Sequence, residues 1–339
     1  MKAAYLVKYG SSDTAFEIRE IKKPEPTSNQ VLIKVEAFGL NFADVMARLG
    51  LYKGAPPLPA LLGYDVVGKI VECGSEVKNL KVGDRVTSLT RFGGYAEYAV
   101  AEKEVTNKIP ESISPGSAVA LATQYSTAYF LSHEMANLRE NDKVLIHAAA
   151  GGVGTALTQM ALHKKCIVFG TCSSADKMEY LKKNGVHHPI NYLKTDFESQ
   201  IKTVLGDEGL DAIFDPVGGK SLKKGYRLLG ASGRLITFGV SSMNQTKSIF
   251  GKIKVLTQFG LYHPLQFLSR SNGIIGVNML KIAEEKPEKI AKVMKAVIKL
   301  NSEGVLTPFV GAEYSIDQLA EAHQFLESRK SKGKIVVKW

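Results

Sequence analysis

The sequence predicts an α/β protein in which a strand-rich region precedes a doubly wound parallel sheet. Up to about residue 116 the chain is rich in turns and in alternating apolar and polar residues. From Ser117 onward, strand-like and helix-like stretches alternate, and three glycines fall within four positions near the middle of the chain. This alternation is typical of a parallel sheet that is covered by helices on both faces.

The bulk composition is that of an ordinary globular protein. The chain has 339 residues, of which 45% are hydrophobic and 23% charged. Because this length is large for a single hydrophobic core, we expect two domains. The longest apolar stretch, 144–161, is interrupted by His147, Gln159 and glycines, which disfavours a membrane span.

The chain begins with an expected strand and contains few cysteines. Residues 1–10 lack a long apolar run, which favours a first strand over a signal peptide. The cysteines are odd in number and lack the spacing of metal ligands, which favours free thiols and a cytoplasmic location. They are Cys73, Cys166 and Cys172.

Further strands are expected in the first region. Residues 30–40 alternate as a half-buried strand does. Residues 66–89 hold two more strands, around glycine-containing turns at 73–75 and 82–84.

Helices and strands then follow in regular order. A helical stretch at 116–136 leads to a strand at 143–148 and a glycine turn. The expected segments after that turn are helices at 155–165, 175–185, 197–206 and 221–229, and strands at 166–172, 187–192, 210–218 and 233–240. A long helix at 287–304 and a strand at 333–339 end the chain, and we expect that strand to return to the first domain.

The glycine turn has the spacing of a dinucleotide site. Ala149, Gly151 and Gly154 match G-x-G-x-x-G, with alanine in the first position. A strand, a bare turn and a helix N-terminus direct N–H groups and the helix dipole at one point, where a pyrophosphate can approach. Such a turn can also serve close packing alone, but the βαβ units that follow favour a dinucleotide.

The end of the next strand favours NADPH over NADH. An NAD site has an acidic residue about twenty residues after the turn, where it binds the ribose 2′-hydroxyl. Here Ser173 stands nineteen residues after Gly154, and Ser174 follows it. Both serines can donate to a phosphate, and Lys177 can neutralise its charge. Tyr192 is either a further phosphate contact or an ordinary aromatic at a strand end.

Positive charge is concentrated in one segment. The net charge is +11, and no Asp or Glu occurs between Pro216 and Ala283. The basic residues of that segment are Lys220, Lys223, Lys224, Arg227, Arg234, Lys247, Lys252, Lys254, Arg270 and Lys281. A basic face near an anionic cofactor is the simpler interpretation, and an acidic membrane is the alternative. Because no aromatic-basic motif accompanies the charge, we expect no nucleic-acid partner.

Several motifs together resemble the quinone oxidoreductase group of the medium-chain dehydrogenase/reductase superfamily, and its vesicle-amine-transport-protein-like (VAT-type) branch most closely. They are GLNFADVMARLGLY, PALLGYDVVG, KVGDRV, AAAGGVGTA, NGVHHPINY, DPVGG and KGYRLL. The resemblance covers essentially the whole chain. It implies a GroES-like, mostly-β catalytic domain from residues 1–120 and 281–339, a Rossmann domain that binds NADP from residues 121–280, and a homodimer.

The sequence departs from the zinc-dependent relatives. Those enzymes place a cysteine where this chain has Asn41, and a His-Glu pair where it has Tyr64 and Asp65. The lobe with four cysteines for a structural zinc is also missing, so we expect no metal and a structural role for Asp65. Without a metal to polarise a carbonyl, the resemblance implies hydride transfer to a quinone or an α,β-unsaturated carbonyl.

The resemblance places four residues around the catalytic cleft. Asn41 can donate its amide to the cofactor or the acceptor. Tyr52 or Tyr64 can donate a proton, although a tyrosine in a cleft more often forms a wall. Asp44 takes part there or only holds Arg48 one helical turn away.

The same resemblance assigns cofactor contacts. Thr127 is expected at the carboxamide end, Gly152 and Val153 at the pyrophosphate, and Val217 at the nicotinamide ribose. The remaining contacts are Phe238, Gly239 and Val240 after the next strand, and Val277 and Asn278 near a dimer-forming edge. Each can also be a core residue, and a shared place at the carboxyl ends of parallel strands is what supports a ligand role.

A second hypothesis is attachment with little turnover. In residues 247–270 basic residues alternate with Phe, Ile and Leu, a composition that suits an anionic membrane surface. A wall of the substrate cleft or a dimer contact is the simpler alternative, because His263-Pro264 breaks any long amphipathic helix.

Overall fold

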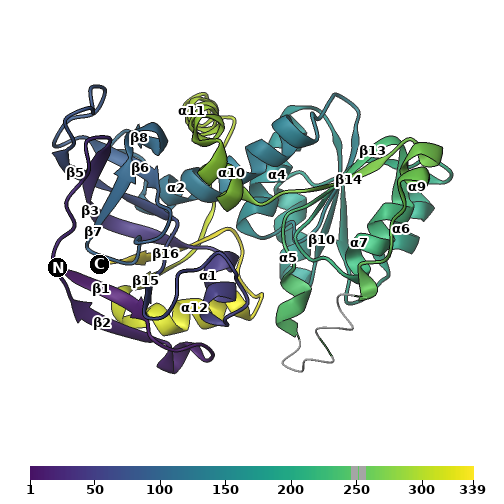
Figure 1. Ribbon diagram of the computed structural model, residues 1–339. Helices are drawn as coiled ribbons and strands as arrows, with labels where there is room; N and C mark the ends of the chain where they lie inside the picture. The colour runs from purple at the N-terminus through teal and green to yellow at the C-terminus, as the bar shows by residue number, and fades with distance from the viewer. Residues whose placement is uncertain (246–250, 252–256) are drawn as a thin grey trace. The chain divides into compact units, whose positions relative to one another are not determined.

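The computed structural model describes residues 1–245, 251 and 257–339. The expected membrane-facing segment 247–270 therefore falls partly outside the described residues. The chain divides into two compact units (Figure 1). The first combines Met1–Ser126 with Leu280–Trp339, and the second is Thr127–Met279.

A seven-stranded sheet is the centre of the first unit. Its order is β15-β16-β3-β5-β6-β8, and β7 also pairs with β3. The strands are β3 (Gln30–Leu40), β5 (Asp65–Cys73), β6 (Arg85–Leu89), β7 (Tyr98–Glu102), β8 (Thr106–Lys108), β15 (Val310–Ser315) and β16 (Lys334–Lys338). The last strand, β16, is antiparallel to β3 and parallel to β15. Residues from both halves of the first unit therefore share one sheet.

A smaller sheet and five helices complete this unit. The sheet has the order β2-β1-β4, with β1 (Lys2–Leu6), β2 (Phe16–Glu20) and β4 (Ala60–Leu61). The helices are α1 (Phe42–Arg48), α2 (Pro115–Ala120), α10 (Met279–Glu285), α11 (Pro287–Ser302) and α12 (Leu319–Glu327).

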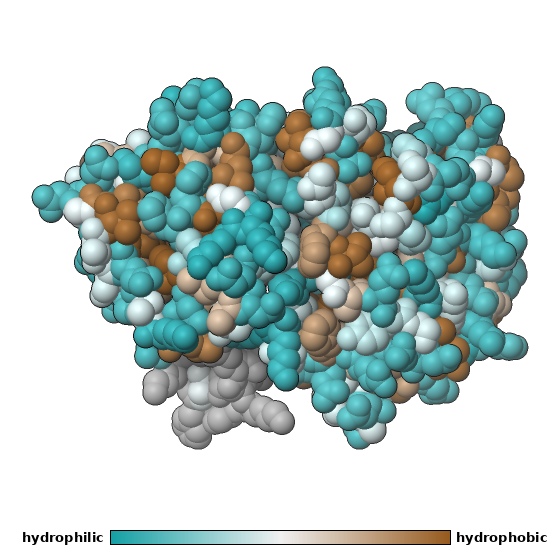
Figure 2. Space-filling model, turned by 180° about the vertical axis from the view of Figure 1, so that it is seen from behind, coloured by the Kyte–Doolittle hydropathy of each residue, from teal (hydrophilic) through white to brown (hydrophobic). Residues whose placement is uncertain are grey.

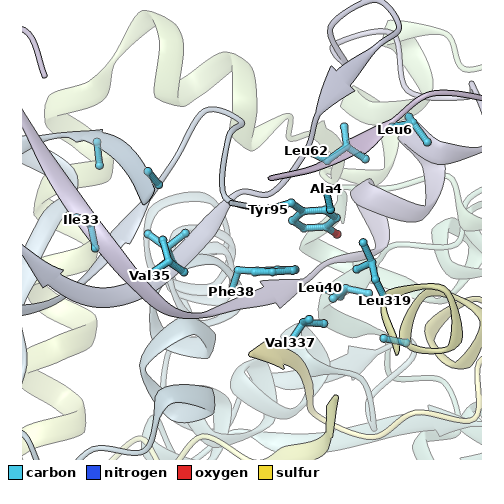
Figure 3. Close-up of a cluster of buried hydrophobic side chains, with 14 of the residues drawn as sticks. Ala4, Leu6, Ile33, Val35, Phe38, Leu40, Leu62, Tyr95, Leu319 and Val337 are labelled. Atoms are coloured by element: carbon cyan, nitrogen blue, oxygen red, sulfur yellow. The ribbon is translucent and has the colours of Figure 1, made fainter. Parts of the chain in front are cut away.

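Strand β3 contributes every second residue to the main core of the first unit, and the phase shifts at the irregularity between Val35 and Ala37. Ile33, Phe38 and Leu40 are buried from solvent. The ring of Phe38 stacks on that of Tyr95, with ring centroids 4.4 Å apart and an angle of 29° between the ring planes, and Figure 3 shows the Tyr95 ring above that of Phe38. Burial of large apolar and aromatic side chains is the main source of stability here. Leu319 of α12 closes this core from the helical side.

The second unit is a six-stranded parallel sheet. Its order is β11-β10-β9-β12-β13-β14. The strands are β9 (Lys143–Ile146), β10 (Ile167–Cys172), β11 (His188–Asn191), β12 (Leu210–Asp215), β13 (Leu229–Thr237) and β14 (Gly273–Gly276), and all five pairings are parallel. Strands β10 and β11 are added on one side of β9, and strands β12 to β14 on the other. The order of addition therefore reverses between β9 and β12, and doubly wound proteins bind ligands at such a point.

Helices cover both faces of this sheet. They are α3 (Ser126–Tyr129), α4 (Gly152–His163), α5 (Ala175–Lys183), α6 (Phe197–Leu205), α7 (Lys220–Leu228) and α9 (Pro264–Arg270). Helices α4 and α5 lie on one face, and α6, α7 and α9 lie on the other (Figure 1). The predicted fold class is confirmed.

Several local features differ from the expected elements. Strand β15 and helix α12 lie in a region where no element was expected. The expected helix at 116–136 is continuous but includes two π-helical segments, Leu121–Tyr125 and Phe130–Met135. Such segments depend on local bond geometry and leave no periodicity in the sequence.

The surface of the described residues is mostly polar. Figure 2 shows hydrophobic side chains in small separate groups on one face of the molecule. Among the described residues, none of the helices combines the length and apolarity that a membrane crossing requires.

Candidate active site

The turn after β9 leaves the N-terminus of helix α4 uncovered by side chains and packs closely against the backbone of that helix. Helix α4 begins at Gly152, and Gly151 is its N-cap. A Cβ on Gly154 would lie 2.4 Å from the carbonyl oxygen of Ala148, whereas one on Gly151 would meet only that atom, at 3.2 Å. Gly154 therefore allows α4 to pack on the turn, and Gly151 keeps the turn bare. The first N–H groups of α4, including that of Val153, have no acceptor within the helix.

The ends of β10 and β11 bring the expected phosphate-binding residues to one edge of the sheet. Ser174 is the N-cap of α5, and its Oγ accepts the backbone N–H of Lys177 at 3.2 Å. Ser173 directly precedes this cap, and the Lys177 side chain is buried. The backbone N–H of Tyr192 donates to the carbonyl oxygen of Cys172, so this exposed tyrosine follows the neighbouring strand end.

A buried carboxylate shapes the turn after β12. Oδ1 of Asp215 accepts the backbone N–H groups of Val217 at 2.6 Å and Gly218 at 2.9 Å. The carbonyl of Asp215 also accepts the N–H of Phe238. Asp215 therefore positions two expected cofactor residues, a role that the sequence analysis missed because the carboxylate bonds only to backbone.

The remaining expected residues of the second unit occupy different places. Gly239 and Val240 follow Phe238, and a Cβ on Gly239 would lie 2.8 Å from the carbonyl oxygen of Pro216. Val277 is buried after β14, and Asn278 is exposed. Thr127 does not share the strand ends. It is a buried residue of α3.

The catalytic candidates of the first unit lie around the start of α1. Asn41 is the N-cap of this helix, and its backbone N–H donates to Oδ2 of Asp44 at 2.8 Å. The expected pairing of Asp44 with Arg48 is wrong. The Arg48 guanidinium instead donates to the carbonyl of Gly10 and to the carboxylate of Glu327, because it points away from the first turn of α1.

Burial makes Asp44 an unusual carboxyl group. Its side chain has no exposed surface, and burial raises its pKa to about 7. The hydrogen bond from Asn41 opposes this rise, the charge of Asp65 adds to it, and the charge of Lys334 opposes it. A carboxyl group with this pKa changes protonation near neutral pH.

The two tyrosines form an aromatic wall. The rings of Tyr52 and Tyr64 meet edge to face at 6.4 Å between centroids, and Phe92 lies 5.1 Å from Tyr64. Burial raises the pKa of both hydroxyl groups, and the charge of Asp44 adds to the rise. Both phenols therefore stay neutral at physiological pH and are weak acids.

A buried lysine completes this cluster. Lys334 forms an ion pair with Asp65, with 2.5 Å between Nζ and Oδ2, and neither side chain has exposed surface. Burial raises the pKa of Asp65, and the ammonium group opposes the rise. The sequence analysis missed Lys334, because a lysine at the start of a strand is usually solvated. In the part of the chain that the structure describes, no group of three His, Cys, Asp or Glu side chains is placed to hold a metal ion.

Comparison with known proteins defines the class. Residues 27–111 match the alcohol dehydrogenase GroES-like domain, and residues 152–296 match the family described as zinc-binding dehydrogenase. Together with the two units above, these matches define a dehydrogenase of the medium-chain type. The chain belongs to the medium-chain dehydrogenase/reductase superfamily, near the VAT-1 homologues and the quinone oxidoreductases.

Particular relatives support this placement. The chain is 36% identical to the synaptic vesicle membrane protein VAT-1 homolog of Danio rerio, over 99% of this chain and 69% of the relative. It is 32% identical to the quinone oxidoreductase of Rattus norvegicus, over 99% of this chain and 97% of the relative. The structure of the Escherichia coli quinone oxidoreductase complexed with NADPH is 26% identical, with a TM-score of 0.86 and full coverage of both chains.

Proposed function

We propose that this protein is a zinc-independent, NADPH-dependent oxidoreductase that transfers hydride to a quinone or an α,β-unsaturated carbonyl compound. The observation that carries the cofactor assignment is the end of β10, where Ser173 and Ser174 stand at the position of the acidic residue of an NAD site. Lys177 follows in the first turn of α5, where Asp176 complements the helix dipole. Two hydroxyl groups and an ammonium group suit a 2′-phosphate, whereas an NAD site has a carboxylate. The NADPH complex of the Escherichia coli relative adds support.

The proposed cofactor site uses the carboxyl edge of the parallel sheet. The bare turn at Gly151 and the N–H groups of Gly152 and Val153 would bind the pyrophosphate. Tyr192 would add a hydroxyl group at the 2′-phosphate. The nicotinamide half would contact Thr127, Val217, Phe238, Gly239, Val240, Val277 and Asn278.

The first unit suggests which acceptors can react. NADPH supplies the hydride when bound. Asn41, Tyr64 and Asp65 offer neither thiolate nor imidazole to a zinc ion. Acceptors that delocalise the incoming charge onto a remote oxygen, as quinones and enones do, suit such a site. Asn41 would donate its amide N–H to that oxygen, and Tyr52 and Tyr64 would form the wall beside a flat ring.

Proton supply is the remaining step. Tyr52 and Tyr64 are weak acids because of their raised pKa values, and Asp44 is buried too deeply to touch a substrate. We therefore propose that the quinol or enolate oxygen takes its proton from water, while Asn41 stabilises the negative charge.

Steady-state oxidation of NADPH tests the function. The assay uses ortho-quinones, para-quinones and small enones, with NADH in parallel and the cofactor affinities measured separately. We expect turnover with NADPH and weak turnover with NADH. Tight NADPH binding without reduction of any acceptor would contradict the proposal and would favour a binding protein.

Attachment to anionic membranes is a second candidate function. Near α9, Leu261, Leu265 and Leu268 are 98%, 65% and 75% exposed, and Arg270 ends the helix. Helix α9 begins at Pro264, so Leu265 and Leu268 lie on a short helix, Leu261 precedes it, and these leucines do not share one long amphipathic helix. Sedimentation with anionic vesicles over a salt series tests this candidate. Salt-sensitive binding would support it, and no binding at low salt would exclude it.

A homodimer is the proposed assembly. Strand β14 stands at the end of the sheet order, and its edge away from β13 has no pairing among the described strands. An open edge of this kind can pair with a second copy. Light scattering coupled to size-exclusion chromatography tests the assembly, and a monomer at micromolar concentration would contradict it.

A further inference from the structure

The Lys334 ammonium group lies at the centre of a buried polar cluster in the first unit. Its Nζ is 2.5 Å from Oδ2 of Asp65 and 3.0 Å from Oδ1 of Asn41. The amide nitrogen of Asn41 lies 3.3 Å from Oδ1 of the same carboxylate. Three strands or strand ends, those of β16, β3 and β5, thus meet at one charge.

The fold provides specific room for this ammonium group. A Cβ on Gly39 would lie 2.1 Å from Cε of Lys334 and 2.3 Å from Nζ, distances that no side chain tolerates. Gly39 lies in β3 opposite Val336, so the lysine side chain crosses the bare backbone of its neighbouring strand. The glycine is needed for space, because the ammonium group occupies the volume of its missing side chain.

A charge in this place must be compensated. Lys334 and Asp65 have no exposed surface, and an unpaired buried charge is strongly destabilising. The carboxylate supplies the opposite charge, and the carbonyl oxygen of Asn41 supplies a further acceptor. Replacement of the pair by two apolar side chains would be no less stable in general, so stability alone does not account for it.

The ammonium group determines how the Asn41 amide can act. A lysine ammonium only donates hydrogen bonds, so the amide atom that faces it must be the oxygen. The amide nitrogen then faces away from Nζ. One of its N–H groups is directed at Asp65 through a long contact, and the other stays available. With its oxygen held toward the cation, Asn41 presents its amide N–H to a ligand, and the positive charge behind the amide strengthens that donation.

We propose that Lys334 is a positioning residue, which holds the Asn41 carboxamide in the orientation that donates to the developing oxyanion of the acceptor. This inference rests on the proposed reductase function. A fixed donor at such an oxygen contributes to the rate, because it needs no reorganisation when charge develops. Lys334 itself contacts neither substrate nor cofactor in this role.

The test uses two variants of the full chain and one control. Lys334→Met removes the cation but leaves Asp65 uncompensated, so this variant can fail to fold. Lys334→Met/Asp65→Asn removes both charges and keeps the side-chain shapes. Lys338→Met is the control, since Lys338 lies in the same strand, is exposed and pairs with Glu313 at the surface.

Kinetics distinguish positioning from a structural role. We expect Lys334→Met/Asp65→Asn to keep its NADPH affinity and to lose at least about tenfold in kcat, as removal of an oxyanion donor does. Asn41→Ala should lower kcat similarly in the wild type, but by less than about threefold in the double variant. The reason is that both changes remove the same interaction, the hydrogen bond from the positioned Asn41 amide to the acceptor. Additive losses, or an unchanged kcat in a folded double variant, would overturn the proposal.

A second readout does not depend on turnover. The side-chain N–H₂ signals of Asn41, identified by their loss in Asn41→Ala, report by NMR how firmly the amide is held. We expect their exchange with solvent to be at least about tenfold faster in the double variant than in wild type and Lys338→Met. Equal exchange would overturn the inference. If no acceptor is reduced by wild type, the reductase function fails, while the exchange rates still decide whether Lys334 fixes the amide.

Discussion

The backbone N–H of Asn41 lies 2.8 Å from Oδ2 of Asp44, and this hydrogen bond closes a capping box at the start of α1. It joins the proposed oxyanion donor to a buried carboxyl group whose pKa is raised to about 7. The protonation state of Asp44 is therefore linked to the end of the helix that carries Asn41.

Asp44→Asn should change how stability depends on pH. The folded pKa of Asp44 lies above its ordinary value of 3.8, so the folded state binds the proton more tightly. The stability that this contributes is complete below about pH 4 and is lost as the pH rises to about 7. Asparagine resembles the protonated carboxyl group. Its advantage over wild type should therefore grow across that range, by on the order of 4 kcal/mol at most.

Denaturant unfolding of both proteins at several pH values measures this effect. Because each value is a difference between two proteins, titrating groups that do not interact with Asp44 cancel. Asp65 and Lys334 are the charged groups that act on Asp44. A difference in unfolding free energy that stays constant from pH 4 to 8 would show that Asp44 titrates normally.

Tyr64→Phe should leave most of the turnover. A proton donor typically contributes 10²- to 10⁴-fold to a rate, but the raised pKa makes this phenol a poor acid. We expect kcat to fall by less than about tenfold, and Tyr52→Phe should behave similarly. A loss beyond a hundredfold, with NADPH affinity unchanged, would identify Tyr64 as the proton donor.

Gly154→Ala should weaken both the fold and cofactor binding, whereas Gly151→Ala should be milder for the fold. The new Cβ at 154 would overlap backbone atoms of Ala148 and Ala149, so α4 must shift. Overpacking of this kind costs about 1–3 kcal/mol. Thermal melting and NADPH titration of both variants test this, and equal melting temperatures would show that the turn can adapt.

Lys177→Glu should weaken the preference for NADPH over NADH. A charge-assisted hydrogen bond contributes about 1.5–3 kcal/mol, so NADPH affinity should fall by about tenfold or more while NADH affinity changes little. Lys182→Glu is the matched control, since Lys182 lies on the same helix, is exposed and pairs with Glu179. Equal losses for both cofactors would place the 2′-phosphate elsewhere.

The doubly wound half of the fold could be predicted from local signals. Its strands are buried apolar runs, and Ser174 and Asp196 each cap a helix with a side-chain hydrogen bond. Strand β15 could not be predicted in this way, because its residues are only half-buried or exposed along their length. Its pairing with β16 determines its conformation instead.

The phosphate-binding candidates could be predicted from the sequence for the same reason. They lie within a few residues of a strand end, where residues that are close in the sequence are also close in the structure. The Lys334 cluster is different, since 293 residues separate Lys334 from Asn41. Nothing in the sequence near Gly39 indicates a contact with Lys334, and nothing near Lys334 indicates one with Gly39. The pairing of β16 with β3 explains why a glycine and a lysine occur at these positions.

The insertion of β16 between β3 and β15 has a consequence for biosynthesis. The second unit is contiguous, so it can fold as soon as it leaves the ribosome. The sheet of the first unit must wait with residues 37–40 of β3 unpaired on the side away from β5 until residues 334–338 are made, because β7 covers only residues 30–34 on that side. Until then Asp65 has no counter-charge, and the nascent chain exposes an open strand to which chaperones or other chains can bind.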